Sequence, residues 1–301
     1  MTKFQFETVD VFTERKFGGN PLAVFADARG LSARQMQLLA AEFNLSETTF
    51  VLPPVDPLNT ALLRIFNRTS EMAFAGHPSI GTAFVLARHG RAPGGKLMLE
   101  MAAGLVPVTL QLDGQGSPTG ALIEAPQPLT IGDTIPADIV AACIGLNVSE
   151  IVTTTHRPVI ASMGNPYVFA EVDAAALRRC EPNIAEFRSA LAAYPSMNGR
   201  FSLHVYARQR EALRARMFAP LAGTWEDPAT GSANAPLVAL LLSLIDRERM
   251  RLEVHQGIEM GRASLLIVEA RRTGGEIRAT VAGKCVHVLR GSLEMTQDDR
   301  G

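Results

Sequence analysis

The sequence predicts an α+β protein of two similar domains. Three observations support this prediction: short strand-like runs fill most of the chain, each half holds one apolar helix, and both halves have the same order of strand, turn, glycine and apolar helix. A chain of 301 residues is long enough for two cores of ordinary size. Its 47% hydrophobic and 20% charged residues are typical of a globular protein.

The first half begins with two strands around a Gly-Gly-Asn-Pro turn at residues 18–21. A helix is predicted at residues 33–43 because Ser32 is a good N-cap and the apolar side chains share one face. A second helix at residues 76–88 is apolar on all sides, which predicts that other elements enclose it. The strands of this half are predicted at residues 4–12, 22–25, 49–53, 61–66, 97–101 and 106–112.

The segment Asp-Gly-Gln-Gly-Ser-Pro at residues 113–118 is the best linker in the chain. It predicts an N-terminal domain of residues 1–116 and a C-terminal domain of residues 119–301, whose last strand is a candidate to return to the N-terminal domain. A further apolar helix is predicted at residues 233–244. The strands of this half are predicted at residues 120–124, 151–159, 167–172, 204–207, 215–218, 252–256, 264–270 and 277–289.

One sequence pattern occurs in both halves of the chain. An Arg-Ile-Phe run at residues 64–66 precedes Gly-His-Pro at 76–78 and an apolar helix, and an Arg-Met-Phe run at 216–218 precedes Gly-Ser-Ala at 231–233 and another apolar helix. The repeat predicts a duplicated pair of domains that face each other.

Composition excludes several kinds of partner. The 29 basic residues nearly balance 30 acidic ones, so no nucleic acid or membrane surface is expected to bind. The three cysteines, Cys143, Cys180 and Cys285, have neither disulfide-framework nor zinc-site spacing. No leader or membrane-spanning pattern is found, which predicts a cytoplasmic protein. Nucleotide-binding and metal-binding motifs are missing as well, so we expect no cofactor and no metal.

Both apolar helices begin with small residues and turn formers, at 75–83 and 227–235. A helix start offers free N–H groups and the positive end of the helix dipole, which together bind carboxylate or phosphate. His77 lies at the first start, where the dipole favours a neutral imidazole. The simpler interpretations remain open: a surface histidine in the first case, and a helix capped by Thr230 or Ser232 in the second.

Glu47 lies between the first helix and the next strand, in the run Asn-Leu-Ser-Glu-Thr-Thr-Phe at residues 44–50. A carboxylate held in a closed apolar cleft is suited to take and return a proton. A solvent-facing carboxylate without a task is the alternative.

Five motifs in order resemble the signatures of the PhzF-like family: GNPLAVF at 19–25, NLSETTF at 44–50, FAGHP at 74–78, EDPATGSA at 226–233 and QGIEMGR at 256–262. The resemblance implies a diaminopimelate-epimerase-like fold. Such a fold has two pseudo-symmetric domains, each an antiparallel β-sheet rolled around a central α-helix, with the active site in the cleft between them. It also implies a homodimer.

The resemblance implies roles for individual residues. Glu47 is the acid and base, while His77, Asp227 and Ser232 bind and position the substrate. Related epimerases use one cysteine at each helix start, where this chain has Ala75 and Thr230, so a single base remains. The residues implied to contact the substrate around the two helix starts are Gly76, Pro78, Ser79, Thr230, Gly231 and Ala233.

These observations predict a cofactor-independent isomerase that shifts a proton on a small carboxylate-bearing substrate. Departures from the expected motifs, such as Asn67-Arg68-Thr69 in place of Thr-Pro, favour a family member of unassigned substrate over the trans-2,3-dihydro-3-hydroxyanthranilate isomerase of phenazine biosynthesis. A catalytically silent protein that binds small acids and a purely structural protein are the alternatives. The structural alternative is disfavoured by four retained residues, Glu47, His77, Asp227 and Ser232, which do not separate the isomerase from the silent binding protein.

Overall fold

The computed structural model describes residues 2–197 and 199–295. The chain forms two compact units: the first runs to Glu124 and takes up the chain again after Val281, and the second lies between these points. The chain therefore passes between units after strand β8 (Pro118–Glu124) and again within strand β18 (Glu276–Met295). In the described part of the chain no helix is both long and apolar enough to cross a membrane.

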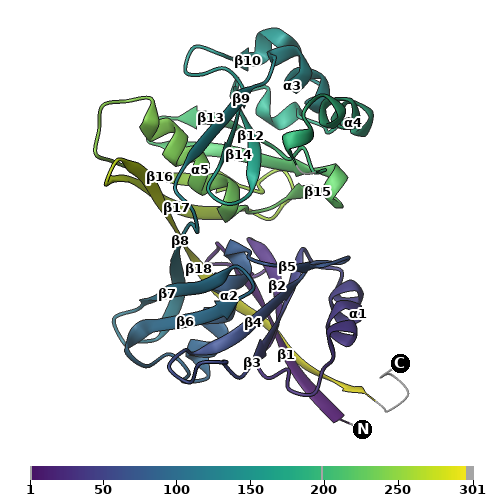
Figure 1. Cartoon of the computed structure of the whole chain (residues 1–301), viewed down its shortest axis with the longest axis vertical. Helices are drawn as coiled ribbons and strands as arrows, with labels where there is room; N and C mark the ends of the chain where they lie inside the picture. Colours follow the sequence, from purple (N-terminus) through teal and green to yellow (C-terminus); the bar gives the residue numbers. More distant parts are fainter. Residues whose placement is uncertain (1, 198, 296–301) are drawn as a thin grey trace. The chain divides into compact units, whose positions relative to one another are not determined.

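The first unit contains two helices and most of the predicted strands (Figure 1). Besides β8 and the end of β18, its elements are β1 (Thr2–Val11), β2 (Asn20–Phe25), α1 (Ala33–Phe43), β3 (Glu47–Leu52), β4 (Ala61–Phe66), β5 (Glu71–Met72), α2 (Gly76–Arg88), β6 (Lys96–Met101) and β7 (Gly104–Leu112).

The second unit contains three helices, of which α3 and α4 were not predicted. Its elements are β9 (Thr130–Thr134), α3 (Ala137–Ile144), β10 (Ile151–Val152), β11 (Val159–Ser162), β12 (Pro166–Val172), α4 (Ile184–Ala193), β13 (Leu203–Gln209), β14 (Ala212–Ala219), β15 (Thr224–Asp227), α5 (Gly231–Ser243), β16 (Arg249–Gln256) and β17 (Ser264–Thr273). The predicted strand at 151–159 is two short strands, β10 and β11, with a loop between them.

Helix α1 begins and ends as its sequence predicts. The Ser32 side chain accepts a hydrogen bond from the Gln35 backbone N–H, and the Gln35 side chain reaches back to the Ser32 N–H, which forms a capping box. Asn44 ends the helix in the left-handed conformation, with φ of 51°. This sharp stop turns the chain directly into β3, whose first residue is Glu47.

Helices α2 and α5 are the buried centres of their units. Every residue of α2 from Gly76 to Leu86 is buried, and α5 is buried almost throughout. Helix α2 packs against β1, β2, β3, β7 and β8, and α5 packs against β11, β16 and β17. The prediction that two apolar helices are enclosed by other elements is therefore confirmed.

The same strand pairings occur in both units. In the first, β1 pairs with β2, β2 with β3, β3 with β4, β4 with β5 and β6, and β6 with β7. In the second, β11 to β17 pair in the same order. Two pairs in each unit are parallel: β2–β3 and β4–β6, then β12–β13 and β14–β16. The sheets are thus mixed rather than purely antiparallel as predicted, because helices connect these strands and return the chain to the same end of the sheet.

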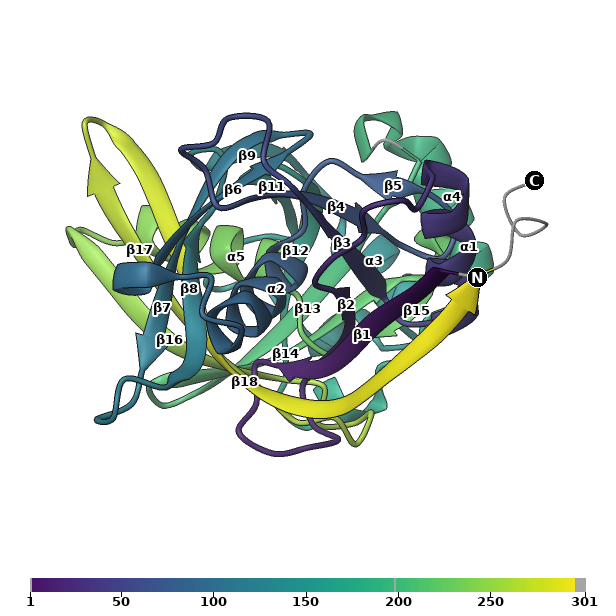
Figure 2. The same ribbon diagram turned by 90° about the horizontal axis from the view of Figure 1, so that it is seen from below.

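The last strand completes the first unit. Figure 2 shows β18 running beside β1, and the two pair antiparallel from Thr2 with Met295 to Val11 with Cys285. Strand β9 occupies the equivalent place in the second unit, where it pairs antiparallel with β11.

Candidate active site

Glu47 is placed by the end of α1 and by its neighbour strand. In the parallel pair of β2 and β3, Glu47 lies opposite Leu22. Thr49, two residues further along β3, hydrogen-bonds to the Ala23 carbonyl and to the Thr82 hydroxyl of α2. These contacts join β3 to the central helix, so the Glu47 carboxylate is held close to the start of α2, with its side chain 16% exposed.

His77 is the second residue of α2 and lies beside Glu47. Its Nδ1 atom is 3.4 Å from Glu47 Oε2. Burial lowers the pKa of His77 to about 3, and the Pro21 carbonyl opposes the shift only weakly. The imidazole is therefore neutral near pH 7, as predicted, although burial rather than the helix dipole is the main cause.

Close packing on β1 and β2 and one side-chain hydrogen bond fix the N-terminal part of α2. Gly81 lies where an added Cβ would come within 2.6 Å of Leu22 Cδ2 and 2.8 Å of Val11 Cγ2, so only glycine allows this close packing on β1 and β2. Ser79 donates its hydroxyl hydrogen to the Ala75 carbonyl at 2.7 Å. The Ser79 side chain therefore stabilises the turn, while Pro78 suits a first turn because it lacks the N–H. No side chain caps this helix, so the first N–H groups after Ala75 remain for an anion.

The second unit places Asp227, Thr230 and Ser232 around the start of α5. Thr230 donates its hydroxyl hydrogen to Asp227 Oδ2 at 2.5 Å. No side chain caps α5 either, so neither Thr230 nor Ser232 acts as the cap considered above. The Ala233 N–H donates to the Thr230 carbonyl and its side chain is fully buried, so Ala233 serves the helix itself. The groups of this helix start that are left for a ligand are the first N–H groups, at the buried Gly231 and the half-buried Ser232, and the Ser232 hydroxyl.

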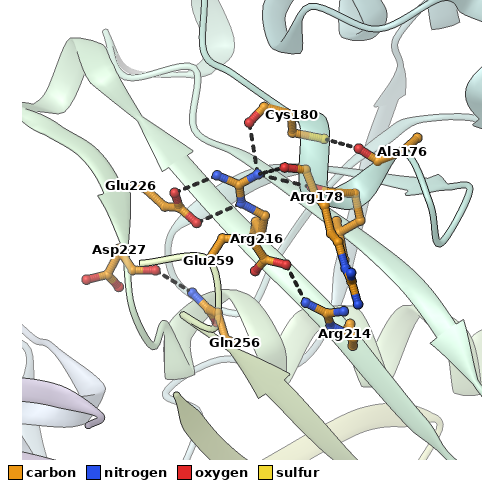
Figure 3. Close-up of polar contacts among 10 residues, drawn as sticks. Ala176, Arg178, Cys180, Arg214, Arg216, Glu226, Asp227, Gln256 and Glu259 are labelled. Atoms are coloured by element: carbon orange, nitrogen blue, oxygen red, sulfur yellow. Dashed lines mark hydrogen bonds and ion pairs between the residues drawn. The ribbon is translucent and has the colours of Figure 1, made fainter. Parts of the chain in front are cut away.

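Gln256, at the end of β16, fixes this turn. Its Oε1 accepts hydrogen bonds from the Thr230 N–H at 3.2 Å and from Asn234 Nδ2 at 2.8 Å. Its Nε2 donates to the Asp227 carbonyl at 2.8 Å, drawn in Figure 3, and to Thr230 Oγ1 at 3.0 Å. Asn234 in turn hydrogen-bonds to His204, a histidine whose pKa burial lowers to about 4. A buried network of neutral groups therefore holds the start of α5.

Tyr167 is the residue that sequence reasoning missed at the start of α5. Its hydroxyl lies 2.7 Å from Ser232 Oγ and forms a hydrogen bond with it. Tyr167 follows a Met-Gly-Asn-Pro run at residues 163–166, and nothing in that run pointed to Ser232. Gln256 begins one quoted motif and Asn234 directly follows another, but nothing in their spacing indicated that they would bond to each other.

The structure therefore brings the predicted residues together in two groups. Glu47, Gly76 and His77 form the first-unit cluster, and Asp227, Thr230, Gly231, Ser232 and Tyr167 form the second-unit cluster. Neither helix start carries a thiol, since the residues before α2 and α5 are Ala75 and Thr230. The cysteines Cys143, Cys180 and Cys285 are buried elsewhere and free of disulfides.

A family model described as phenazine biosynthesis-like protein matches residues 9–291. The chain belongs to the PhzF-like family. An uncharacterized isomerase of Mesorhizobium japonicum is 37% identical over 296 residues, which cover 94% of this chain and 96% of the relative. The trans-2,3-dihydro-3-hydroxyanthranilate isomerase of Pseudomonas chlororaphis is 35% identical over 95% of this chain and 97% of its own length.

A solved PhzF-family phenazine biosynthesis protein from Bacillus anthracis has the same fold. It superposes with a TM-score of 0.87 at 26% identity and covers 98% of this chain and 100% of its own. Both of these curated relatives are named as isomerases, and the protein is a PhzF-like isomerase with an α+β fold.

Proposed function

We propose that Glu47 is the single base of this isomerase and moves a proton between two carbons of one substrate. The contact between Glu47 and the neutral His77 at the start of α2 carries the proposal. A carboxylate can remove a proton from a carbon made acidic by conjugation and return it to another position on the same face. Because neither helix start has a thiol, no second base of the epimerase kind is available.

His77 has a positioning part in this proposal. A neutral imidazole contributes one N–H donor and one acceptor without adding a full charge beside the base. It can orient the Glu47 carboxylate and hydrogen-bond to the substrate. The N–H groups of Gly76 and His77 bind an acid group of the substrate, aided by the dipole of α2.

The second-unit cluster supplies the other contacts. Ser232 and the N–H groups at Gly231 and Ser232 are donors for oxygen atoms, and Asp227 accepts hydrogen bonds from an amino or hydroxyl group. We propose that both clusters bind the same substrate and that the two units are pseudo-symmetric domains. The repeated strand pairings around α2 and α5 support such a duplication, with the start of each central helix as an equivalent point.

The substrate class follows from these contacts. A small molecule with a carboxylate, a polar amino or hydroxyl group and an acidic C–H would use both helix starts and both carboxylates. Trans-2,3-dihydro-3-hydroxyanthranilate, named for the relatives, is the first compound to test. The reaction needs no cofactor, because Glu47 takes a proton from one carbon and delivers a proton to another with no net oxidation or reduction. The carboxyl proton can exchange with solvent between these two steps.

Incubation in deuterium oxide tests the proposal. The enzyme would be mixed with trans-2,3-dihydro-3-hydroxyanthranilate and with related hydroxylated and amino acids, and the products weighed by mass spectrometry. We expect one deuterium at carbon in a substrate of this enzyme, and none with the Glu47→Gln variant. Equal incorporation with that variant would remove Glu47 from the mechanism.

We further propose that the enzyme is a homodimer and works in the cytoplasm. Its cysteines are buried thiols, and burial raises the pKa of Cys143 and of Cys180 to about 12, so they are poor thiolates and slow to oxidise. Light scattering on the purified full chain tests the dimer, since a monomer mass at all concentrations contradicts it.

A further inference from the structure

A pocket lined mainly by polar side chains lies in the second unit, on the other side of the sheet from α5. It has a volume of about 440 Å³. Its lining residues come from the turn after β12, from β13, β14 and β16, and from the loop after β16: Arg178, Gln209, Arg214, His255, Ile258 and Glu259. A volume of this size is in the range of small-molecule sites.

The alternation of side chains separates this pocket from the candidate active site. Gln256 points to the start of α5, so its neighbour His255 points to the opposite face of β16. On β13, His204 contacts α5 through Asn234, whereas Val205 and Ala207 join the core under α3 and α4. Gln209 follows Val205 and Ala207 on the same face of β13, so the pocket lies on the face of the sheet that is turned away from α5.

Two guanidinium groups share this pocket with one carboxylate. Arg214 is buried and forms an ion pair with Glu259. In Figure 3 the Arg178 side chain runs toward Arg214, and both line the same pocket. Among the described residues no carboxylate pairs with Arg178. Two like charges converge here with a single counter-charge, which is unfavourable unless an anion joins them.

Arg178 is an exposed residue whose backbone is held by a buried neighbour. The Arg216 guanidinium forms two hydrogen bonds of 2.8 Å with Glu226. Its remaining nitrogen donates to the carbonyls of Leu177 at 3.0 Å and Cys180 at 2.9 Å, on either side of Arg178 (Figure 3). The backbone that carries Arg178 is therefore fixed before any ligand arrives.

The loop that carries Ile258 and Glu259 is fixed as well. The Arg262 N–H donates to the Gly257 carbonyl at 2.9 Å, and the Gly261 N–H donates to the Ile258 carbonyl at 3.0 Å. Gly257 has φ of 72°, and a Cβ there would lie 2.6 Å from the Pro228 carbonyl oxygen. The loop thus closes one wall of the pocket with an apolar side chain, Ile258.

We propose that this pocket binds a small organic anion, through a phosphate or carboxylate group held between Arg178 and Arg214. Guanidinium groups bind both kinds of anion through paired N–H donors. His255 and Gln209 add hydrogen-bond donors at the rim, and Ile258 receives a short hydrocarbon part. The site is separate from the Glu47 and Ser232 clusters and needs neither of them.

The test uses the full chain with inorganic phosphate and with succinate as probes, at constant ionic strength because salt screens such contacts. Calorimetric titration measures binding, and the shift in melting temperature gives a second readout. The variant is Arg178→Ala, which breaks no ion pair of the folded chain. The matched control is Arg188→Ala, an exposed arginine of α4 that does not line the pocket.

We expect saturable binding of at least one probe, weakened about tenfold or more by Arg178→Ala and abolished by Arg178→Glu. The Arg188→Ala and Glu47→Gln variants should bind as the unaltered chain does. The stronger of the two probes identifies the preferred head group. The proposal would be overturned if neither probe showed saturable binding, if Arg178→Glu left binding unchanged, or if binding were lost only in Glu47→Gln. None of these results bears on the isomerase reaction.

Discussion

The Oε2 atom of Glu47 and the Nδ1 atom of His77 lie 3.4 Å apart, and they join the first residue of β3 to the second residue of α2. Because burial lowers the pKa of His77 to about 3, this contact is not an ion pair at neutral pH. The imidazole can therefore orient the carboxylate without neutralising it. This arrangement suits a base that must take up a proton and release it again.

Glu47→Gln should lower the turnover number by about 10²- to 10⁴-fold, since the shape is kept and only the base is lost. Substrate affinity should change little. Steady-state kinetics on the substrate found by deuterium exchange measure both. Glu42→Gln is the matched control, because Glu42 is an exposed carboxylate on α1. An active Glu47→Gln variant contradicts the assigned role.

The free energy of unfolding should decrease as the pH is lowered below about 6.5, in part because of His77. The unfolded imidazole has a pKa of about 6.5 and binds a proton that the folded one, with a pKa of about 3, does not. The free energy of unfolding should drop by about 2 kcal/mol between pH 6.5 and pH 5 from this residue alone. His204 adds a drop in the same direction, because burial lowers its pKa to about 4.

His77→Gln should therefore flatten the acid side of the stability curve. Urea unfolding at pH 7 and pH 5 measures the difference for the unaltered chain, for His77→Gln and for the control His255→Gln, whose side chain is 38% exposed. Only the pH dependence is compared, since a buried glutamine has its own cost at both values. The same slope in all three proteins would show that His77 is protonated as readily when folded as when unfolded.

Gly81→Ala should destabilise the first unit by about 1–3 kcal/mol, because the new methyl group would overlap Leu22 and Val11. The shift of α2 should also separate His77 from Glu47 and reduce turnover. Gly114→Ala is the control, since a Cβ at that turn meets no atom within 4 Å. Thermal unfolding and kinetics measure the two effects, and equal behaviour of the two variants contradicts the packing argument.

Gln256→Ala should cost about 2–4 kcal/mol, since it removes four hydrogen bonds and leaves buried partners at Thr230, Asp227 and Asn234 without them. The start of α5 should loosen, and the Michaelis constant should rise. Urea unfolding compared with the exposed Gln115→Ala measures the stability part. A loss no larger than that of Gln115→Ala would mean that the network is not needed.

Tyr167→Phe and Ser232→Ala remove the same hydrogen bond from opposite ends. Each should raise the Michaelis constant more than it lowers the turnover number, because the bond positions a binding group rather than the base. In the double variant the effects should not add, with a coupling energy of about 0.5–1.5 kcal/mol. Strictly additive effects would show that Tyr167 acts independently of Ser232.

Short-range patterns predicted much of the fold. The Ser32 cap, the apolar faces of 33–43 and the all-round apolar helix at 76–88 depend on residues within a few positions of each other, and the structure has all three. Helix α3 was missed because its eight residues form a short apolar run that fits a helix or a strand equally well. Helix α4 begins after Asn183, whose side chain accepts a hydrogen bond from the Ala185 N–H. Asparagine is a common N-cap, so the sequence did contain a signal for the start of this helix.

By itself the sequence predicted the candidate residues, since Glu47, His77 and Ser232 stand in short motifs that can be read along the chain. Only the tertiary structure decided their environment. The parallel pairing of β14 with β16 brings Gln256 to Thr230, and the packing of α2 among strands removes water from His77. The reason is physical: caps and helix faces depend on neighbours in the chain, whereas burial and cross-strand hydrogen bonds depend on segments that only folding brings together.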